Sequence, residues 1–388
     1  MNEGRLIFTQ VMDMLHREQF DRCVSRYPMP RRSRGMSARD QFLAMTFAQI
    51  TYRDGLRGIE GCLRPSRNLY AMGIRGNITR TNLAYANEFR DWRVYEEVAQ
   101  SLIRKTRRLY IDDSNSLCLD EMVYAVDAST IDLCLSLFPW ATFRKTKAAI
   151  KLHTQIDLTG SIPVFISITE GSVHDVNFLE QMTFEAGSIY VFDRGYLDFR
   201  RLFQVDTAKA FFVIRSKSNT RFTVRESRYV DTSTGLRCDQ VIKLSTYKGK
   251  RDYPERLRRI SFIDPETKKR LVFLTNNFDL PALVIAAIYK SRWKIELFFK
   301  WIKQNLRIKA FYGTSDNAVR TQIWIAISVY LMVACLNKVH RINENLGIIL
   351  ELLSVNIFQK MPFNQLVADF TTRNDDSPDC KQLIFHGF

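Results

Sequence analysis

Cysteine motifs at zinc-binding spacing are missing from this chain of 388 residues. The sequence has no CxxC motif and no Cys/His grouping at zinc spacing, although it contains seven cysteines: Cys23, Cys62, Cys118, Cys134, Cys238, Cys335 and Cys380. We therefore expect free thiols in a reducing cytosol. A metal site, if there is one, would have to use ligands other than sulfur.

A membrane-spanning run and an export signal are missing as well. Residues 321–337 carry no charge, but they include Thr, Gln, Ser and Asn and fall short of the roughly 20 apolar residues that cross a bilayer. The first ten residues, MNEGRLIFTQ, lack a basic segment followed by an apolar run. We predict a cytoplasmic protein without a membrane partner, in which residues 321–337 form a buried core helix.

Lysine is absent from the first 100 residues, which contain 16 Arg and 11 acidic residues. Arginine without lysine favours bidentate binding of phosphate or guanine, although a bias in nucleotide composition explains it about as well. The whole chain has a net charge of +16, and residues 215–270 alone hold 16 Lys or Arg against 7 Asp or Glu. This charge indicates a polyanionic partner, and the 46% hydrophobic content indicates a folded protein.

The hydrophobic pattern divides the chain into a helical first part and an α/β second part. Ser37 with Asp40 predicts a capping box, and Thr79 predicts another helix start before RTNLAYANEF. A turn containing glycine separates residues 56–63 from Thr79, which fits a helix-turn-helix and an ordinary helical bundle equally. After Asp120, short apolar strands alternate with helices, which predicts an α/β core with a β-rich insertion at about residues 215–280.

Two acids follow apolar, strand-like runs. Asp127 ends VYAVD and Asp193 ends IYVFD, so both are expected at the carboxyl ends of strands, where an open α/β sheet carries its chemistry. Glu296, on a later helix, could complete a set of three carboxylates. Such a set favours Mg²⁺ or Mn²⁺, and paired ions of this kind promote in-line displacement at a phosphodiester. One Asp at a strand end is, by itself, more often a turn or helix cap.

The segment 289–303, YKSRWKIELFFKWIK, places four polar residues on one face of a predicted helix. They stand at offsets of zero, three, seven and fourteen: Tyr289, Arg292, Glu296 and Lys303. One stripe then carries a carboxylate, two cations and a phenol, which suits a metal site that also binds a polyanion. The four residues alone leave a second interpretation open, namely a solvated amphipathic face with ion pairs.

The same four residues match the Tyr, two residues, Arg, three residues, Glu, six residues, Lys signature of bacterial cut-and-paste transposases of the insertion-sequence-four group. The chain also resembles that family at VDAST, which contains Asp127, and at FDRGYLD, where Asp193, Gly195 and Tyr196 fit an Asp-x-Gly-aromatic pattern. The three blocks lie in the expected order, with the β-rich insertion before Glu296. Because the helical first part resembles the end-binding region of many such proteins, the resemblance covers most of the chain.

The resemblance implies a ribonuclease-H-like catalytic fold. The catalytic domain would span residues 116–340, after a helical, Arg-rich region at residues 1–115 and before a helical extension at residues 341–388. Asp127, Asp193 and Glu296 would be both the catalytic acids and the metal ligands. They would hold two Mg²⁺ ions, for which Mn²⁺ can substitute.

The family also implies a course of action on double-stranded DNA. The region 1–115 would bind the terminal inverted repeats, and a homodimer would pair them in a synaptic complex within the nucleoid-associated cytoplasm of a bacterium. The enzyme would cut at the element ends and join the freed 3′-hydroxyls to target DNA. Phosphates beside the scissile bond would contact Tyr289, Arg292 and Lys303, with Lys300 sharing the work of Lys303. Arg80, which opens the predicted second helix, would contact DNA from the first part of the chain.

One feature of the family has no direct counterpart here. Some relatives stack a Trp of the β-rich insertion on a base that is flipped out while a DNA hairpin forms, and this chain has no Trp within residues 200–285. Tyr247, Tyr253 or Phe262 could stack instead. Two other functions stay open: a catalytically silent DNA-binding protein derived from a transposase, and a metal-dependent nuclease without strand transfer.

Several other polar residues have simpler expected roles. Asp157 is predicted at a hairpin turn, and Asp175 and Asp198 are predicted to cap the helices that follow them. His174 or Lys151 could support the catalytic acids without contacting the metal.

Overall fold

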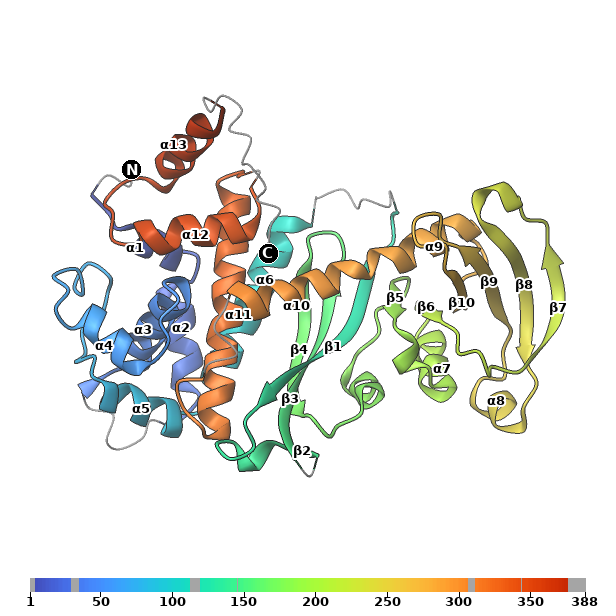
Figure 1. Ribbon diagram of the computed structural model, residues 1–388, viewed down its shortest axis with the longest axis horizontal. Coiled ribbons are helices and arrows are strands. Elements are labelled where there is room, and N and C mark those ends of the chain that lie inside the picture. The colour runs from blue at the N-terminus through green and yellow to red at the C-terminus, as the bar shows by residue number, and fades with distance from the viewer. Residues whose placement is uncertain are drawn as a thin grey trace, which may run out of the picture. The chain divides into compact units, whose positions relative to one another are not determined.

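The computed structural model of the chain describes residues 4–28, 35–111, 119–144, 146–305, 311–342 and 344–375. The chain divides into two compact units (Figure 1). The first unit comprises Met1–Leu102, Asn305–Gly313 and Asn317–Phe388, and the second comprises Ile103–Gln304 and Thr314–Asp316. The first unit is thus assembled from both ends of the chain, whereas the second is nearly continuous. The assignment of functional domains within these units stays a prediction.

The first unit is helical in its described residues. Its elements are α1 (Ile7–Met12), α2 (Arg17–Ser25), α3 (Ala38–Ile50), α4 (Leu56–Leu63), α5 (Arg80–Phe89), the first part of α6 (Arg93–Tyr110), nearly all of α11 (Asp316–Val339), α12 (Leu346–Asn356) and α13 (Phe363–Asp375). The predicted capping box opens α3, because Ser37 and Asp40 each bind the backbone N–H of the other. Thr79 is the N-cap of α5, also as predicted.

Helix α11 supplies much of the core of the first unit. Among the described helices it alone is long and apolar enough to cross a membrane, judged by length and composition, and 94% of its apolar window is buried inside the protein. Trp324, its largest side chain, is 1% exposed. The prediction of a buried core helix at residues 321–337 is therefore confirmed.

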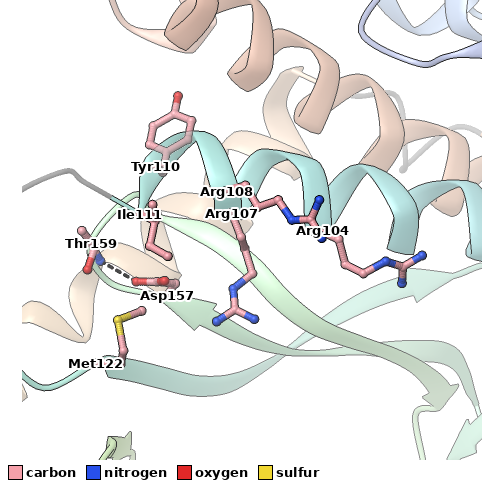
Figure 2. A pocket seen from close by; sticks show the side chains of 8 residues that line it. All are labelled: Arg104, Arg107, Arg108, Tyr110, Ile111, Met122, Asp157 and Thr159. Carbon is pink, nitrogen blue, oxygen red and sulfur yellow. Dashed lines mark hydrogen bonds between the residues drawn. The ribbon is translucent and has the colours of Figure 1, made fainter.

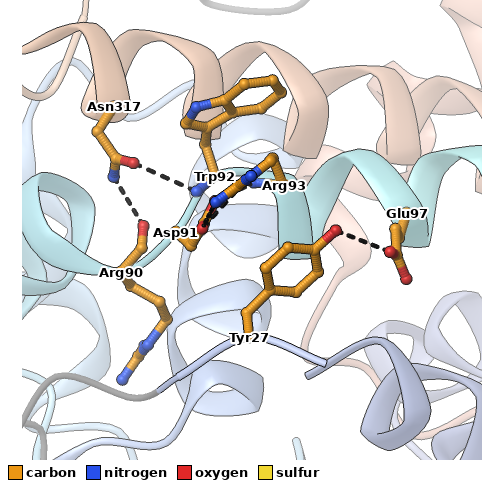
Figure 3. A network of polar contacts seen from close by, with 7 residues as sticks. All are labelled: Tyr27, Arg90, Asp91, Trp92, Arg93, Glu97 and Asn317. Carbon is orange, nitrogen blue, oxygen red and sulfur yellow. Dashed lines mark hydrogen bonds and ion pairs between the residues drawn. The ribbon is translucent and has the colours of Figure 1, made fainter. Parts of the chain in front are cut away.

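A polar network fixes the turn between α5 and α6 (Figure 3). The side-chain amide of Asn317 donates to the carbonyl oxygens of Asn87 and Arg90 at 2.8 and 2.7 Å, and its oxygen accepts the N–H of Trp92. The buried guanidinium of Arg90 donates in turn to the backbone carbonyls of Met36 and Ser37. Because unpaired buried polar groups are costly, these contacts hold the turn in one conformation.

A ten-stranded mixed sheet forms the second unit. Its strands are β1 (Val123–Leu133), β2 (Thr142–Arg144), β3 (Lys147–Asp157), β4 (Ile162–Glu170), β5 (Ile189–Phe192), β6 (Phe211–Arg215), β7 (Phe222–Arg228), β8 (Leu236–Leu244), β9 (Leu257–Ile263) and β10 (Arg270–Thr275). Their order is β2-β3-β1-β5-β6-β10-β9-β8-β7, with β4 also paired to β3. Strands β1, β5 and β6 run parallel to one another, and the remaining neighbours are antiparallel.

The chain order explains this topology. Strands β1, β3 and β4 form an antiparallel meander, after which β5 and β6 extend the sheet in parallel, and α7 (Phe199–Thr207) connects them (Figure 1). Strands β7 to β9, yellow in Figure 1, form the β-rich insertion with α8 (Tyr247–Asp252), and β10 returns to β6. The predicted α/β ribonuclease-H-like core, with its insertion and a helical region before it, is confirmed.

One face of the sheet is packed by a single hydrophobic cluster. Tyr124 and Val126 of β1 belong to it, together with Phe192 of β5 and Leu202 of α7. Side chains alternate between the two faces of a strand. Asp127, the next residue of β1, therefore points to the opposite face, where α9 (Ala282–Ser291) and α10 (Trp293–Asn305) supply their side chains.

Candidate active site

Asp127 lies in the middle of β1 and does not end it as predicted. Strand β1 continues to Leu133 because its antiparallel pairing with β3 continues, whereas its parallel pairing with β5 stops at Val126 opposite Phe192. Asp127 is thus the first β1 residue beyond the parallel ladder. Its Oδ1 accepts the backbone N–H of Ala128 at 2.8 Å, and 21% of its side chain is exposed.

Asp193 occupies the corresponding position after β5. It directly follows Phe192, as predicted, and is the N-cap residue of the 3₁₀ turn Arg194–Tyr196. Since Phe192 pairs with Val126, the two acids take neighbouring positions where the parallel strands separate. The hydroxyl of Tyr289 in α9 donates to Oδ1 of Asp193 over a long 3.4 Å.

The segment 289–303 forms two helices and not the single predicted one. Helix α9 ends at Ser291, Arg292 is the turn residue, and α10 begins at Trp293. Arg292 keeps helical dihedral angles, φ −52° and ψ −27°, so the backbone between α9 and α10 stays helical in conformation at this residue. Glu296 lies in the first turn of α10, and Phe298 of the same helix is buried.

Arg292 joins two of the three predicted acids. Its Nη1 donates to Oδ2 of Asp127 at 2.8 Å, and its Nη2 donates to Oε1 of Glu296 at 2.6 Å. Only 15% of the Arg292 side chain is exposed, and its Nε has no hydrogen-bond partner in the part of the chain that the structure describes. Buried charge needs a partner, so the guanidinium and the two carboxylates stabilise one another here.

The electrostatics of the site follow from burial and from the crowding of acids. Burial is the main reason that the pKa of Asp127 is raised to about 6, and the nearby charges of Asp193 and Glu296 contribute in the same direction. The Arg292 charge and the N–H of Ala128 act in the opposite direction on the same pKa. A carboxylate with such surroundings gains from a cation placed beside it.

The donor set fits a hard divalent cation, although the three acids do not yet enclose one. Within the described ranges, no three His, Cys, Asp or Glu side chains are close enough to hold a metal ion. Arg292 already fills the space between Asp127 and Glu296 with positive charge. All three acids offer only oxygen ligands, which Mg²⁺ and Mn²⁺ prefer. The chemistry of the donor set therefore suits such an ion, although the described arrangement of the three acids does not enclose one.

The other three predicted phosphate-binding residues, Lys303, Lys300 and Arg80, lie in different surroundings. Lys303 lies near the site, because its Nζ donates to the carbonyl of Thr130, three residues after Asp127 on β1, at 2.9 Å. Lys300 is exposed on α10. Arg80 belongs to the first unit, where its side chain is exposed and its backbone N–H donates to Glu60.

Two buried groups beside the acids were only partly foreseen. Lys151 of β3 forms an ion pair with Asp175 at 2.9 Å. Asp175 is the first residue of a 3₁₀ helix and His174 is its N-cap residue, so the prediction of Asp175 as the helix cap is wrong. Tyr196 is 1% exposed, and its hydroxyl lacks a partner in the described part of the chain. Burial and the charges of Asp127, Asp175 and Asp193 raise the pKa of this phenol. The Asp-x-Gly-aromatic pattern pointed to Tyr196, but nothing in the sequence indicated that its hydroxyl would be buried without a hydrogen-bond partner among the described residues.

The remaining expectations have mixed outcomes. Asp198 caps α7 as predicted, and Asp157 ends β3 at the predicted hairpin. Tyr253 is fully buried and donates to Asp206, so it cannot stack on a flipped base. Tyr247 is 84% exposed at the start of α8 and keeps that possibility.

Comparison with known proteins finds a family match over more than half of the chain. Residues 119–332 match the family model described as the transposase DDE domain, and residues 3–75 match a model described as a domain of unknown function. The chain is 34% identical over 270 residues to a Sinorhizobium fredii protein named as the transposase y4zB. The aligned residues make up 67% of this chain and 72% of the relative. It is 31% identical over 244 residues to a Geobacillus stearothermophilus protein named as the transposase of insertion sequence element IS5377, covering 61% of this chain and 64% of that one. A Synechocystis protein, named as a transposase for insertion sequence element IS4SA, is 23% identical over 270 residues, which is 68% of this chain and 74% of the relative.

Proposed function

The chain belongs to the DDE transposases of bacterial insertion sequences, and we propose that it cuts DNA at the ends of its element and joins the freed 3′-hydroxyls to target DNA. One observation carries the assignment of the catalytic residues. Asp127 and Asp193 stand at neighbouring positions where β1 and β5 separate, and Arg292 ties Glu296 of α10 to Asp127. Three oxygen donors from distant segments thus converge at one edge of the parallel strands.

DDE transposase domains use divalent metal ions, and Asp127, Asp193 and Glu296 are the residues that would hold two Mg²⁺ ions here. Such ions would activate the attacking water or 3′-hydroxyl and stabilise the charge on the departing oxygen. The protein's own residues set the geometry. Strands β1 and β5 give the two Asp residues neighbouring positions, and the buried Ile295 and Phe298 anchor α10, whose Glu296 is linked to Asp127 through Arg292.

Arg292 has to leave Asp127 and Glu296 before those carboxylates can take a cation. DNA offers the guanidinium another partner, because a phosphate accepts two N–H donors in the same geometry as a carboxylate. We propose that Arg292 moves onto a phosphate beside the scissile bond when DNA enters. Lys303, which now donates to Thr130, and the hydroxyl of Tyr289 would contact phosphates on the same side.

The helical first unit would recognise the terminal inverted repeats. The exposed Arg80 at the start of α5 supports a contact with DNA, and the surplus of arginine in the first 100 residues supports a phosphate-binding role. Two element ends must be brought together before joining, so we propose that the protein acts as a homodimer. Membership of the insertion-sequence-four group, rather than another group of the family, rests on the signature from Tyr289 to Lys303.

A hairpin intermediate is a further possibility for excision. The exposed ring of Tyr247 in the insertion supports it, because any aromatic face can receive an unpaired base. Hairpin-ended products that disappear in Tyr247→Ala would establish this route. Only nicked or blunt ends would contradict it.

The decisive test uses purified protein, a duplex that carries the element end, and Mg²⁺ or Mn²⁺. Asp127→Asn, Asp193→Asn and Glu296→Gln keep the shape of each side chain and remove its charge. Each should abolish end-specific cleavage while leaving binding to the duplex largely intact. Asp132→Asn is the matched control, because Asp132 is an exposed acid of the same strand as Asp127.

The outcomes separate the candidate functions. Cleavage followed by joining of the 3′-hydroxyl to a target plasmid supports the transposase, whereas cleavage without joining supports a nuclease. Binding without cleavage under every metal condition supports a silent DNA-binding derivative. Full cleavage by Glu296→Gln would show that the catalytic assignment is wrong.

A further inference from the structure

A basic pocket lies at the end of the second unit remote from the three acids (Figure 2). Its volume is about 310 Å³, and it opens between the last turns of α6 and the strand ends at Met122 and Asp157. Arg104, Arg107 and Arg108 line it from α6 at offsets of three and four residues, which is the spacing of one helix face. We propose that this pocket binds a backbone phosphate of DNA, at a distance from the phosphate that is cut.

The three arginines have different environments, and the difference supports a binding role. Nη2 of Arg107 donates to the hydroxyl of Tyr124 at 2.9 Å, and Tyr124 donates in turn to Glu185 at 2.7 Å. Arg107 is therefore held in place by the fold. Arg104 and Arg108 are exposed and form no ion pair with any described residue. Two cations beside a fixed third leave a surplus of positive charge at the mouth of the pocket.

The one carboxylate in the pocket does not cancel this surplus. Asp157 is 8% exposed, and its Oδ1 accepts the backbone N–H of Thr159 at 2.9 Å, as Figure 2 shows. The ammonium group of Lys294 donates to the carbonyl of Leu158 and is also attracted electrostatically to the Asp157 carboxylate. The acid is thus buried and has Arg107 as a nearby charge, while Arg104 and Arg108 are exposed to solvent. An anion that enters meets the cations first.

The pocket is separate from the catalytic acids. Met122 stands five residues before Asp127, which corresponds to about 16 Å along an extended strand. Tyr124 and Asp157 are paired across β1 and β3, and Tyr124 points to the face opposite Asp127. One phosphate cannot contact both places. The pocket would therefore hold a stretch of DNA other than the one being cut, and the choice of DNA as the partner rests on the proposed function.

The salt dependence of DNA binding tests the proposal without any need for cleavage. The full-length variant Arg104→Ala/Arg108→Ala keeps α6 intact, since alanine is the best helix former. Binding of a labelled duplex that carries the element end would be titrated with KCl. Removing one phosphate contact should lower the slope of log K against log salt by about 0.9. We expect the slope of the double variant to be smaller by between about one and two units, with a weaker affinity at every salt concentration.

A control of equal charge makes the result specific. Arg341→Ala/Lys360→Ala removes two exposed cations from the C-terminal helical extension and should leave the slope at the wild-type value. Ethylation of individual phosphates should map one or two sensitive positions away from the cleavage site that become insensitive in the pocket variant only. An unchanged slope in the pocket variant, or an equal decrease in the control, would overturn the proposal. Failure of the catalytic assignment would appear instead as cleavage by the variants of the three acids, with the slopes unaffected.

Discussion

Nη1 of Arg292 lies 2.8 Å from Oδ2 of Asp127, and the same guanidinium reaches Glu296 through its second nitrogen. In the free protein, an arginine thus holds the place between two carboxylates where a divalent cation would bind. The pKa of Asp127 is raised to about 6, chiefly by burial, even though the charge of Arg292 acts to lower it, so the ionised carboxylate depends on a cationic neighbour. The arginine and the metal are therefore expected to compete.

The first prediction concerns that competition. Arg292→Gln removes the cation and leaves a shorter, uncharged amide. Without DNA, the variant should bind Mn²⁺ several-fold more tightly than the wild type, because no guanidinium has to be displaced. With DNA, the same variant should cut the element end more slowly, because a phosphate loses its bidentate partner. Mn²⁺ affinity can be measured by calorimetry or by electron paramagnetic resonance.

Arg194→Gln is the matched control for metal affinity. Arg194 directly follows Asp193 and is exposed, and no ion pair joins it to any described residue. Arg194→Gln removes one positive charge, as Arg292→Gln does, but it opens no space between Asp127 and Glu296. It should therefore alter Mn²⁺ affinity much less than Arg292→Gln. Equal or weaker Mn²⁺ binding by Arg292→Gln would show that Arg292 supports the metal site rather than competing with it.

The local settings of Asp193 and Glu296 could be predicted because the relevant signals are local. The apolar run before Asp193 ends in turn residues, and the strand indeed ends there. The spacing from Tyr289 to Lys303 placed Glu296 on a helix face whose apolar neighbours are buried. Periodicity and turn chemistry report such features directly.

The errors arose where a long-range partner decides the structure. Strand β1 continues beyond Asp127 because β3 continues beside it, and a short apolar run does not reveal its neighbour's length. The pairing of Asp175 with Lys151 depends in the same way on which strand packs against the turn. Tyr253 looked available for stacking, yet its ring is buried against Phe203 and Phe212 of other elements. Tertiary packing overrides local pattern at such positions.

A second prediction separates two lysines of α10. Lys303 donates to the carbonyl of Thr130 and so lies beside the strand that carries Asp127, whereas Lys300 is exposed. Lys303→Ala should slow end cleavage by roughly a hundredfold to a thousandfold, the range for loss of one well-placed donor. Lys300→Ala should slow it much less. Single-turnover cleavage at saturating protein measures both, and the opposite ranking would move the phosphate contact to Lys300.

A third prediction concerns pH and the buried His153. This side chain stacks on Phe178, its Nε2 is 2.9 Å from the hydroxyl of Thr169, and burial lowers its pKa to about 4. The unfolded chain therefore binds the proton first as pH falls below about 6.5, so the stabilisation is present above that pH and is lost toward the folded pKa. The wild type should lose about 2 kcal/mol of unfolding free energy between about pH 7 and pH 5 from this group. His153→Gln should lack that loss.

Urea unfolding at the two pH values, in the presence of a chelator, measures this difference. Other titrating groups contribute equally to both proteins and cancel in the comparison. His16→Gln, which changes an exposed histidine of the first unit, should keep the wild-type pH dependence. If His153→Gln lost as much stability as the wild type between the two pH values, the buried histidine would not be the responsible group.

The last prediction distinguishes a DNA contact from a structural role at the start of α5. Thr79 caps the helix through its side-chain oxygen, so Thr79→Ala should cost about 1 kcal/mol of stability. Arg80→Ala touches only an exposed side chain and should change stability by less than about 0.5 kcal/mol. Its effect should appear in end binding instead, as a salt slope reduced by about 1. Thermal unfolding and salt-titrated DNA binding, measured on both variants, give the contrast. A stability loss without any change of slope in Arg80→Ala would place Arg80 outside the DNA-binding surface, because losing a phosphate contact reduces the number of counterions released on binding and so must lower the slope.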